Sequence, residues 1–119
     1  MNDMQFLTWA GVKKEVLNDH MSRRVITGER AMIAEVIITR GGIVPLHHHE
    51  SEQLSYCLEG ALKLEVEGKE VTIHPGEVLV IPSNVPHSAV ALEDFRGFDI
   101  FSPIRHDWLD GTDSYLRKK

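Results

Sequence analysis

Short apolar runs alternate with turn-forming residues through the middle of the chain. Leu62, Leu64 and Val66 are separated by charged residues, which is the two-residue period of a strand with one buried face. Residues 25–102 contain no sustained helical period. Short strands separated by Gly, Pro and Asn are typical of an all-β sandwich or barrel, so the pattern predicts an all-β fold.

Turn signals such as Glu59-Gly60 and Pro75-Gly76 set the bounds of the expected strands. The acidic and aromatic stretch 107–110 is expected to form one helical turn or to pack as irregular chain. We expect strands at residues 30–39, 53–58, 61–66, 70–74, 78–81, 87–92 and 97–101.

The length of 119 residues fits one domain. We expect a β-barrel body at residues 25–110, preceded by a less regular segment at 1–24 and followed by a tail at 111–119. The apolar stretch 6–12 is too short to form a layer of its own. The first segment is therefore expected to pack on the barrel or on a partner subunit, and we predict a homodimer.

Composition and charge narrow the classes of partner. The chain is 42% hydrophobic and carries a formal net charge of -5 without a basic stripe, so we expect no nucleic-acid partner. No run approaches the roughly 20 apolar residues of a membrane span, so we expect no membrane partner. Cys57 is the one cysteine and the first residues contain no apolar stretch typical of a signal peptide, which together favour the cytoplasm.

Three consecutive histidines provide the first candidate chemistry. On an extended backbone His47 and His49 point to one side and His48 to the other, so the pair forms a two-ligand clamp for a transition metal. Gln53 has the same parity and rejoins that face if the register does not slip before it; a slip would bring Glu52 there instead. His87 follows a proline-containing turn, begins a new strand and is the best remaining ligand.

These residues resemble the two motifs of the cupin superfamily. The first motif, GxxxxxHxHxxxExxxxxxG, and the second, GxxxxxPxGxxHxxxN, are matched by Gly41, His47, His49, Gln53 and Gly60, and by Gly76, Pro82 and His87. The sequence departs from them at Gln53, Asn84 and Ala91. The resemblance implies a single cupin-type jelly-roll β-barrel with a metal ion inside its mouth.

The expected metal site consists of His47, His49, Gln53 and His87. An amide in place of the usual carboxylate leaves the full +2 charge on the ion, which makes it a stronger Lewis acid. Such ligands suit one divalent transition metal ion, and Zn, Ni, Fe, Co and Mn all remain open.

The stretch from Asp99 to Leu109 also resembles the C-terminus of small pectin-degradation cupins, which open the ring of unsaturated uronates. The resemblance places catalytic roles on Asp99, Phe101 and Arg105, with the arginine fork gripping a carboxylate. Asp99 and Phe101 share one face of a strand, which should be the interior if that strand neighbours the strand of His87. The alternative is that Asp99 forms a structural ion pair with Arg105 or another cation.

The leading interpretation is an enzyme of the isomerase or lyase type that acts on a small carboxylate-bearing sugar. A metal-dependent dioxygenase, which would use Fe and O₂, is the second interpretation. A non-catalytic module that binds or senses a small molecule is the third. A shared fold does not choose among them.

Overall fold

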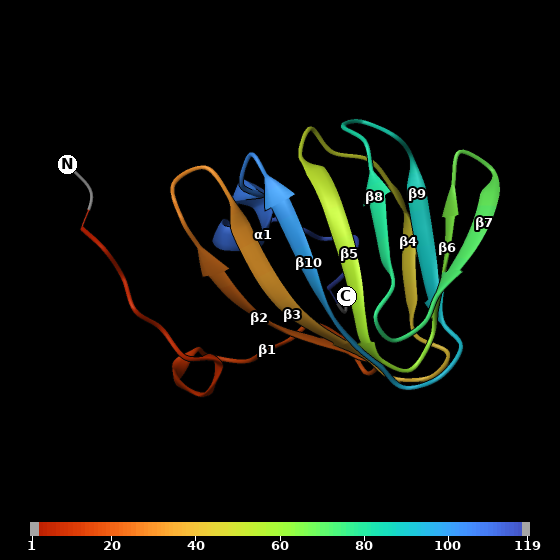
Figure 1. Cartoon of the computed structure of the whole chain (residues 1–119), viewed down its shortest axis with the longest axis horizontal. Coiled ribbons are helices and arrows are strands. Elements are labelled where there is room, and N and C mark those ends of the chain that lie inside the picture. Colours follow the sequence, from red (N-terminus) through yellow and green to blue (C-terminus); the bar gives the residue numbers. More distant parts are fainter. Residues whose placement is uncertain (1–2, 118–119) are drawn as a thin grey trace.

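The computed structural model describes residues 3–117 and consists of two β-sheets (Figure 1). The larger sheet has the strand order β1-β2-β3-β10-β5-β8 and the smaller has the order β4-β9-β6-β7, at the right of Figure 1. The strands are β1 Glu15–Val16, β2 Met21–Thr27, β3 Met32–Ile38, β4 Ile43–His47, β5 Glu52–Glu59, β6 Leu62–Val66, β7 Lys69–Ile73, β8 Val78–Ile81, β9 His87–Ala91 and β10 Phe95–Ser102.

The all-β prediction is confirmed, and each expected strand has a counterpart within a few residues of its expected bounds. The pairings among the described residues are antiparallel and join strands within each sheet. They leave two sheets, a pattern consistent with a jelly roll, rather than one hydrogen-bonded closed barrel.

Strand β2 was not predicted, and it crosses the division that we expected between residues 24 and 25. Its centre carries two adjacent arginines, which hide the strand from a hydrophobic pattern. Arg23 is only 1% exposed and points inward, where acidic partners compensate its charge. A strand whose inward side chain is a paired cation has no alternation of apolar and polar residues to detect.

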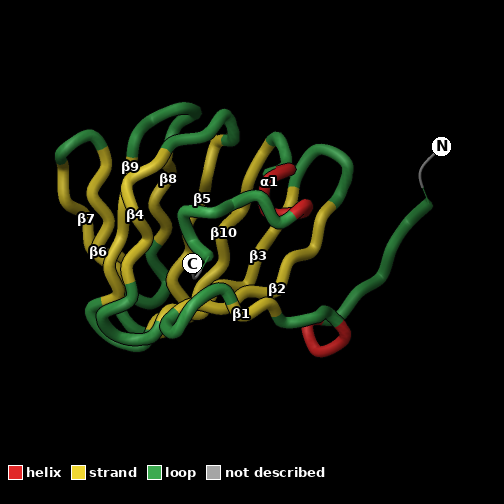
Figure 2. Tube along the Cα trace, turned by 180° about the vertical axis from the view of Figure 1, so that it is seen from behind, coloured by secondary structure: helices red, strands yellow, loops and turns green. Residues whose placement is uncertain are grey.

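The chain after β10 belongs to the packed body. Helix α1 (His106–Asp110) is the expected helical turn, and Gly111 ends it in a left-handed conformation with φ 78°. Figure 2 shows the chain after α1 turning back toward β4. Leu116, in the stretch expected to be a tail, is 2% exposed within the core, while residues 118–119 of that stretch lie outside the described part.

The N-terminal arm leaves the sheets, as Figure 1 shows. Its short 3₁₀ turn (Trp9–Gly11) returns one aromatic ring to the larger sheet, where Trp9 stacks on Phe98 at 5.7 Å between ring centroids. Met4 and Phe6 are 97% and 92% exposed. Within residues 3–117 no helix is long and apolar enough to span a bilayer.

Candidate metal centre and substrate cavity

Three histidines converge between the two sheets. His47 ends β4, His87 begins β9, and the two residues are register partners; His49 follows in the loop before β5. One ligand atom from each lies within 4.8 Å of the others. The parity prediction is confirmed for this pair, because His48 is exposed.

Each of these rings is held by a backbone carbonyl at its Nδ1 atom. The acceptors are Pro45 for His47 (2.7 Å), Ser51 for His49 (2.8 Å) and Val85 for His87 (2.8 Å). This orients the rings as metal ligands are usually oriented, with Nε2 free to bind an ion. The Nε2 atom of His87 is buried and has no partner among the described residues, so the donor set fits a transition metal.

Gln53 turns its side-chain oxygen toward this cluster. Its Oε1 atom lies 3.0 Å from Nε2 of His49, while its Nε2 atom donates to Ser55 Oγ (2.9 Å) and to Asp99 Oδ1 (3.4 Å). Gln53 is buried whereas Glu52 is exposed, so the register does not slip before this residue. The amide oxygen is thus available as a fourth ligand.

The histidines are neutral at pH 7. Burial, reinforced by the charges of neighbouring histidines and Arg105, lowers the pKa of His47 and of His49 to about 4. Burial also lowers the pKa of His87. Neutral imidazoles keep the lone pairs that a metal ion requires.

Asp99 faces the interior, although not for the reason that we expected. Its strand β10 lies in the larger sheet and the strand of His87 lies in the smaller one, so the two residues meet across the cavity rather than on neighbouring strands. Burial raises the pKa of Asp99 to about 6, against an opposing hydrogen bond from Ser55 Oγ (2.7 Å). A carboxyl group near this pKa exchanges a proton readily close to neutral pH.

Arg105 is 5% exposed, and it contacts Asp107 rather than Asp99, the acid of the alternative ion pair. Its Nε and Nη2 atoms donate to Asp107 (3.1 and 2.9 Å), and Nη2 also donates to the Tyr115 hydroxyl (2.9 Å). Its partner among the described ion pairs is therefore Asp107 and not Asp99. The buried Nη1 atom has no partner among these residues.

Phe101 packs between His49 and Arg105. It is 1% exposed, and its ring lies 5.7 Å from the ring of His49 and 5.2 Å from the Arg105 guanidinium. In this position it lines the cavity and lies against the arginine.

These groups enclose one cavity, which His47, Gln53, His87, Asp99 and Arg105 all line. Its volume is about 30 Å³, which is enough to hold at least one water molecule. The enclosed part can hold a small polar group, and a larger ligand has to extend toward the mouth, where two of the histidines are partly exposed.

Residues 34–101 match the family model described as a cupin domain. The chain belongs to the cupin family. This cupin is 31% identical over 98 residues to the pectin degradation protein KdgF of Dickeya dadantii, across 80% of this chain and 89% of that relative. It also superposes on the structure of KdgF from Halomonas sp. with a TM-score of 0.83 and 30% identity, covering 89% of this chain and 99% of the other.

A relative of lower identity is named for a different activity. Quercetin 2,3-dioxygenase of Bacillus subtilis is 26% identical over 85 residues, which is 66% of this cupin but 25% of the relative. The three clustered histidines and Gln53 fall within the matched residues 34–101.

Three further polar residues of this cupin's site were not predicted from the sequence, and they are Ser55, Asp107 and Tyr115. Ser55 shares the strand parity of Gln53, so the sequence did contain the pattern that would have identified it. Asp107 and Tyr115 lie after the matched residues, and only the turn at Gly111 brings Tyr115 back until its ring is 4.5 Å from the ring of His47. Burial raises the pKa of Tyr115, so its phenol stays protonated.

Proposed function

We propose that this cupin is a metal-dependent enzyme that opens the ring of a 4,5-unsaturated uronate to a linear keto acid. The observation that carries the proposal is one cavity lined by an acid of pKa about 6, by two of the three clustered neutral histidines and by an arginine with one nitrogen that has no partner among the described residues. The likeness to two KdgF proteins over most of the chain supports it.

His47, His49, His87 and Gln53 would hold the metal ion. When bound, a divalent Zn, Ni, Fe, Co or Mn ion supplies Lewis acidity toward a hydroxyl or carboxylate oxygen of the substrate. The carbonyls at the three Nδ1 atoms keep the rings aimed at the ion.

The reaction moves protons and needs no oxidant. The anomeric hydroxyl loses its proton, the bond between the anomeric carbon and the ring oxygen breaks to give an aldehyde and an enolate, and the enolate takes up a proton at its carbon as it becomes a ketone. Asp99 accepts the first proton and returns it in the last step. The hydrogen bonds from Ser55 and Gln53 hold its carboxyl group in place for both transfers.

Arg105 would bind the uronate carboxylate. Asp107 and Tyr115 take up its Nε and Nη2 atoms, so Nη1 is the nitrogen left for a ligand. The side-by-side fork expected from the sequence is therefore occupied by Asp107, and Arg105 offers the substrate a single nitrogen.

Turnover of a panel of 4,5-unsaturated uronates by the metal-loaded enzyme tests the proposal. Asp99→Asn should lower kcat by about 10²–10⁴-fold while it keeps the metal, because the amide cannot accept the proton. Asp3→Asn, which changes an exposed acid on the N-terminal arm, is the control. No turnover by the wild type would show that the substrate class is wrong, and an active Asp99→Asn variant would remove Asp99 from the mechanism.

Dioxygenase activity is the second candidate, favoured by relatives such as 3-hydroxyanthranilate 3,4-dioxygenase of Bacillus thuringiensis, 28% identical across 74% of this chain and 52% of that relative. An oxygenase consumes O₂ and loses activity when Zn replaces Fe. Ring opening proceeds without O₂, so an oxygen electrode separates the two.

We also propose that the enzyme is a homodimer that works in the cytoplasm. The N-terminal arm carries Met4 and Phe6 into solvent, and a second subunit offers cover for this apolar surface. Light scattering should give twice 13.5 kDa, and the double substitution Met4→Ser and Phe6→Ser should lower that mass. A wild-type mass near 13.5 kDa at micromolar concentration would rule the dimer out.

A further inference from the structure

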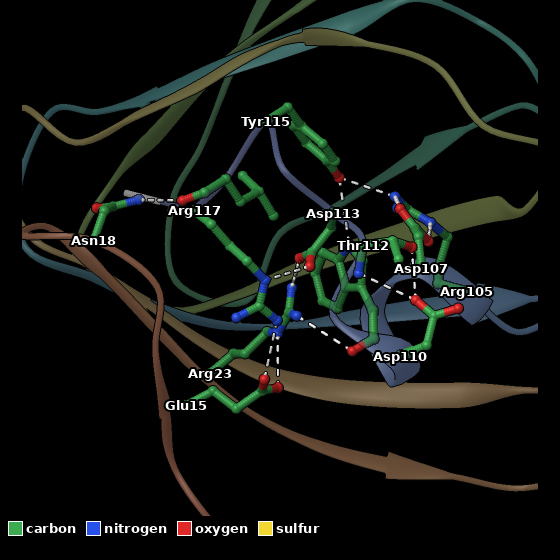
Figure 3. A network of polar contacts seen from close by, with 12 residues as sticks. Glu15, Asn18, Arg23, Arg105, Asp107, Asp110, Thr112, Asp113, Tyr115 and Arg117 are labelled. Atoms are coloured by element: carbon green, nitrogen blue, oxygen red, sulfur yellow. Dashed lines mark hydrogen bonds and ion pairs between the residues drawn. The ribbon is translucent and has the colours of Figure 1, made fainter. Parts of the chain in front are cut away.

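The C-terminal segment 111–117 is fastened to the body of the protein by a buried ion-pair network (Figure 3). Asp113 and Arg23 have fully buried side chains and meet at 2.7 Å, and Arg117 adds a second contact to Asp113 at 2.8 Å. Asn18 donates to the backbone carbonyl of Leu116 at 2.8 Å. These contacts hold the residue between them, Tyr115, in a fixed place.

That place is the substrate cavity. Tyr115 lines it together with His47, Asp99 and Arg105. Its hydroxyl oxygen accepts hydrogen bonds from Arg105 Nη2 (2.9 Å) and from Trp108 Nε1 (3.3 Å), of which Figure 3 shows the first between labelled residues.

Counting hydrogens shows which donors are left. A guanidinium has five N–H hydrogens, and Arg105 uses the one on Nε and both on Nη2 for Asp107 and Tyr115. Its two Nη1 hydrogens remain. The phenol of Tyr115 accepts two hydrogen bonds, and its own hydrogen has no acceptor among the described residues.

We propose that Tyr115 is a substrate-binding residue, whose hydroxyl forms a two-donor clamp with Arg105 Nη1 around the carboxylate of the substrate. The inference rests on the proposed uronate substrate. A carboxylate is best held by two donors, one for each oxygen, and Asp107 has already taken the side-by-side pair on Arg105. Tyr115 supplies the second donor from a segment that lies after the family-matched residues 34–101.

Tyr115→Phe tests the clamp, because it removes the hydroxyl and keeps the ring against His47. Calorimetry on the metal-loaded protein measures the Kd for galacturonate, a saturated uronate that cannot react, and for galactose, which lacks the carboxylate. We expect Tyr115→Phe to weaken galacturonate binding and to raise KM by about tenfold, as expected for a lost hydrogen bond to a charged group, with galactose binding, metal content and kcat little changed.

Tyr56→Phe is the matched control, since Tyr56 does not line the cavity, and it should leave both Kd values unchanged. Equal galacturonate binding by Tyr115→Phe and wild type overturns the clamp, as does an equal loss for galactose, which would indicate a general packing defect. Failure of the uronate proposal is separate, because it appears as a wild type that turns over no unsaturated uronate. A wild type that does not bind galacturonate would overturn the clamp as well.

Discussion

Two buried arginines contact the same tryptophan and have opposite hydrogen-bond states. The guanidinium of Arg23 lies 4.1 Å from the Trp108 ring and that of Arg105 lies 5.2 Å from it, and the residues are 1% and 5% exposed. The three nitrogens of Arg23 donate hydrogen bonds to Glu15, Asp113 and the carbonyl of Trp108. Arg105 lines the cavity, and its Nη1 atom has no partner among the described residues.

This difference distinguishes an arginine that stabilises the fold from an arginine that is available to bind a ligand. A buried charge with every nitrogen paired adds specificity to the fold, because no partner can be exchanged without a large cost. A buried donor without a partner is costly to the folded protein and persists where a ligand supplies the missing acceptor. The buried Nε2 of His87 in the same cavity is the converse case, because it has no partner among the described residues and carries a lone pair that a metal ion would take up.

The largest expected effect is on the histidine cluster. His49→Ala should reduce the metal content of the purified protein from about one ion per chain to almost none, because two imidazoles and an amide do not hold the ion. His48→Ala, which changes the exposed histidine beside it, should keep the metal. Elemental analysis measures both, and equal metal content in the two variants would contradict the assigned site.

Arg23→Met should give the next largest effect and should act on stability. It leaves the fully buried carboxylate of Asp113 with Arg117 alone and costs about 3–5 kcal/mol of unfolding free energy. The double variant Arg23→Met with Asp113→Leu should recover much of this loss, since it removes both charges. Urea denaturation measures the free energies, and a single variant as stable as wild type would show that the pair is not structural.

Arg105→Met is the same substitution at the other arginine and should act on binding. It should raise KM for the uronate by about tenfold or more, while the unfolding free energy changes by about 1 kcal/mol or less, because Asp107 is one-third exposed and can be hydrated. Steady-state kinetics and urea denaturation together give both values. A large stability loss with an unchanged KM would place Arg105 with Arg23 as a structural group.

The sequence predicts the parts of this cupin that depend on local period. The two-residue period of a strand places His47 and His49 on one side, and it places Asp99 with Phe101 on the inner face of β10. Strand β2 escaped prediction because a paired cation replaces an apolar residue at its buried position.

Partners that are distant along the chain could not be predicted in this way. Arg23 and Asp113 are 90 residues apart, and nothing in the local pattern of either one names the other. Tyr115 lies in a stretch without periodicity, and its place depends on the left-handed turn at Gly111 and on the buried anchor beside it. Long-range ion pairs of this kind become visible only when the fold has brought the segments together.

The smallest expected effect is the pH dependence of stability in the metal-free protein. The pKa of His47 and His49 falls from an ordinary value of 6.5 to about 4 on folding, so the unfolded chain binds protons that the folded one does not as the pH falls below 6.5. Stability is then lost over this range. Asp99 has the opposite sign, because its folded pKa of about 6 lies above its ordinary 3.8, and it offsets part of the loss between these values.

The histidines outnumber the single acid, so the Tm of the metal-free protein should fall by several degrees from pH 7 to pH 5 in thermal unfolding followed by circular dichroism. Asp99→Asn should make this decrease steeper, because the offsetting group is gone, whereas Asp3→Asn on the exposed arm should leave the profile as in wild type. A Tm that rises toward pH 5 in the wild type would mean that Asp99 dominates the cavity. The histidines would then not be the groups that set how the stability of the metal-free protein changes with pH.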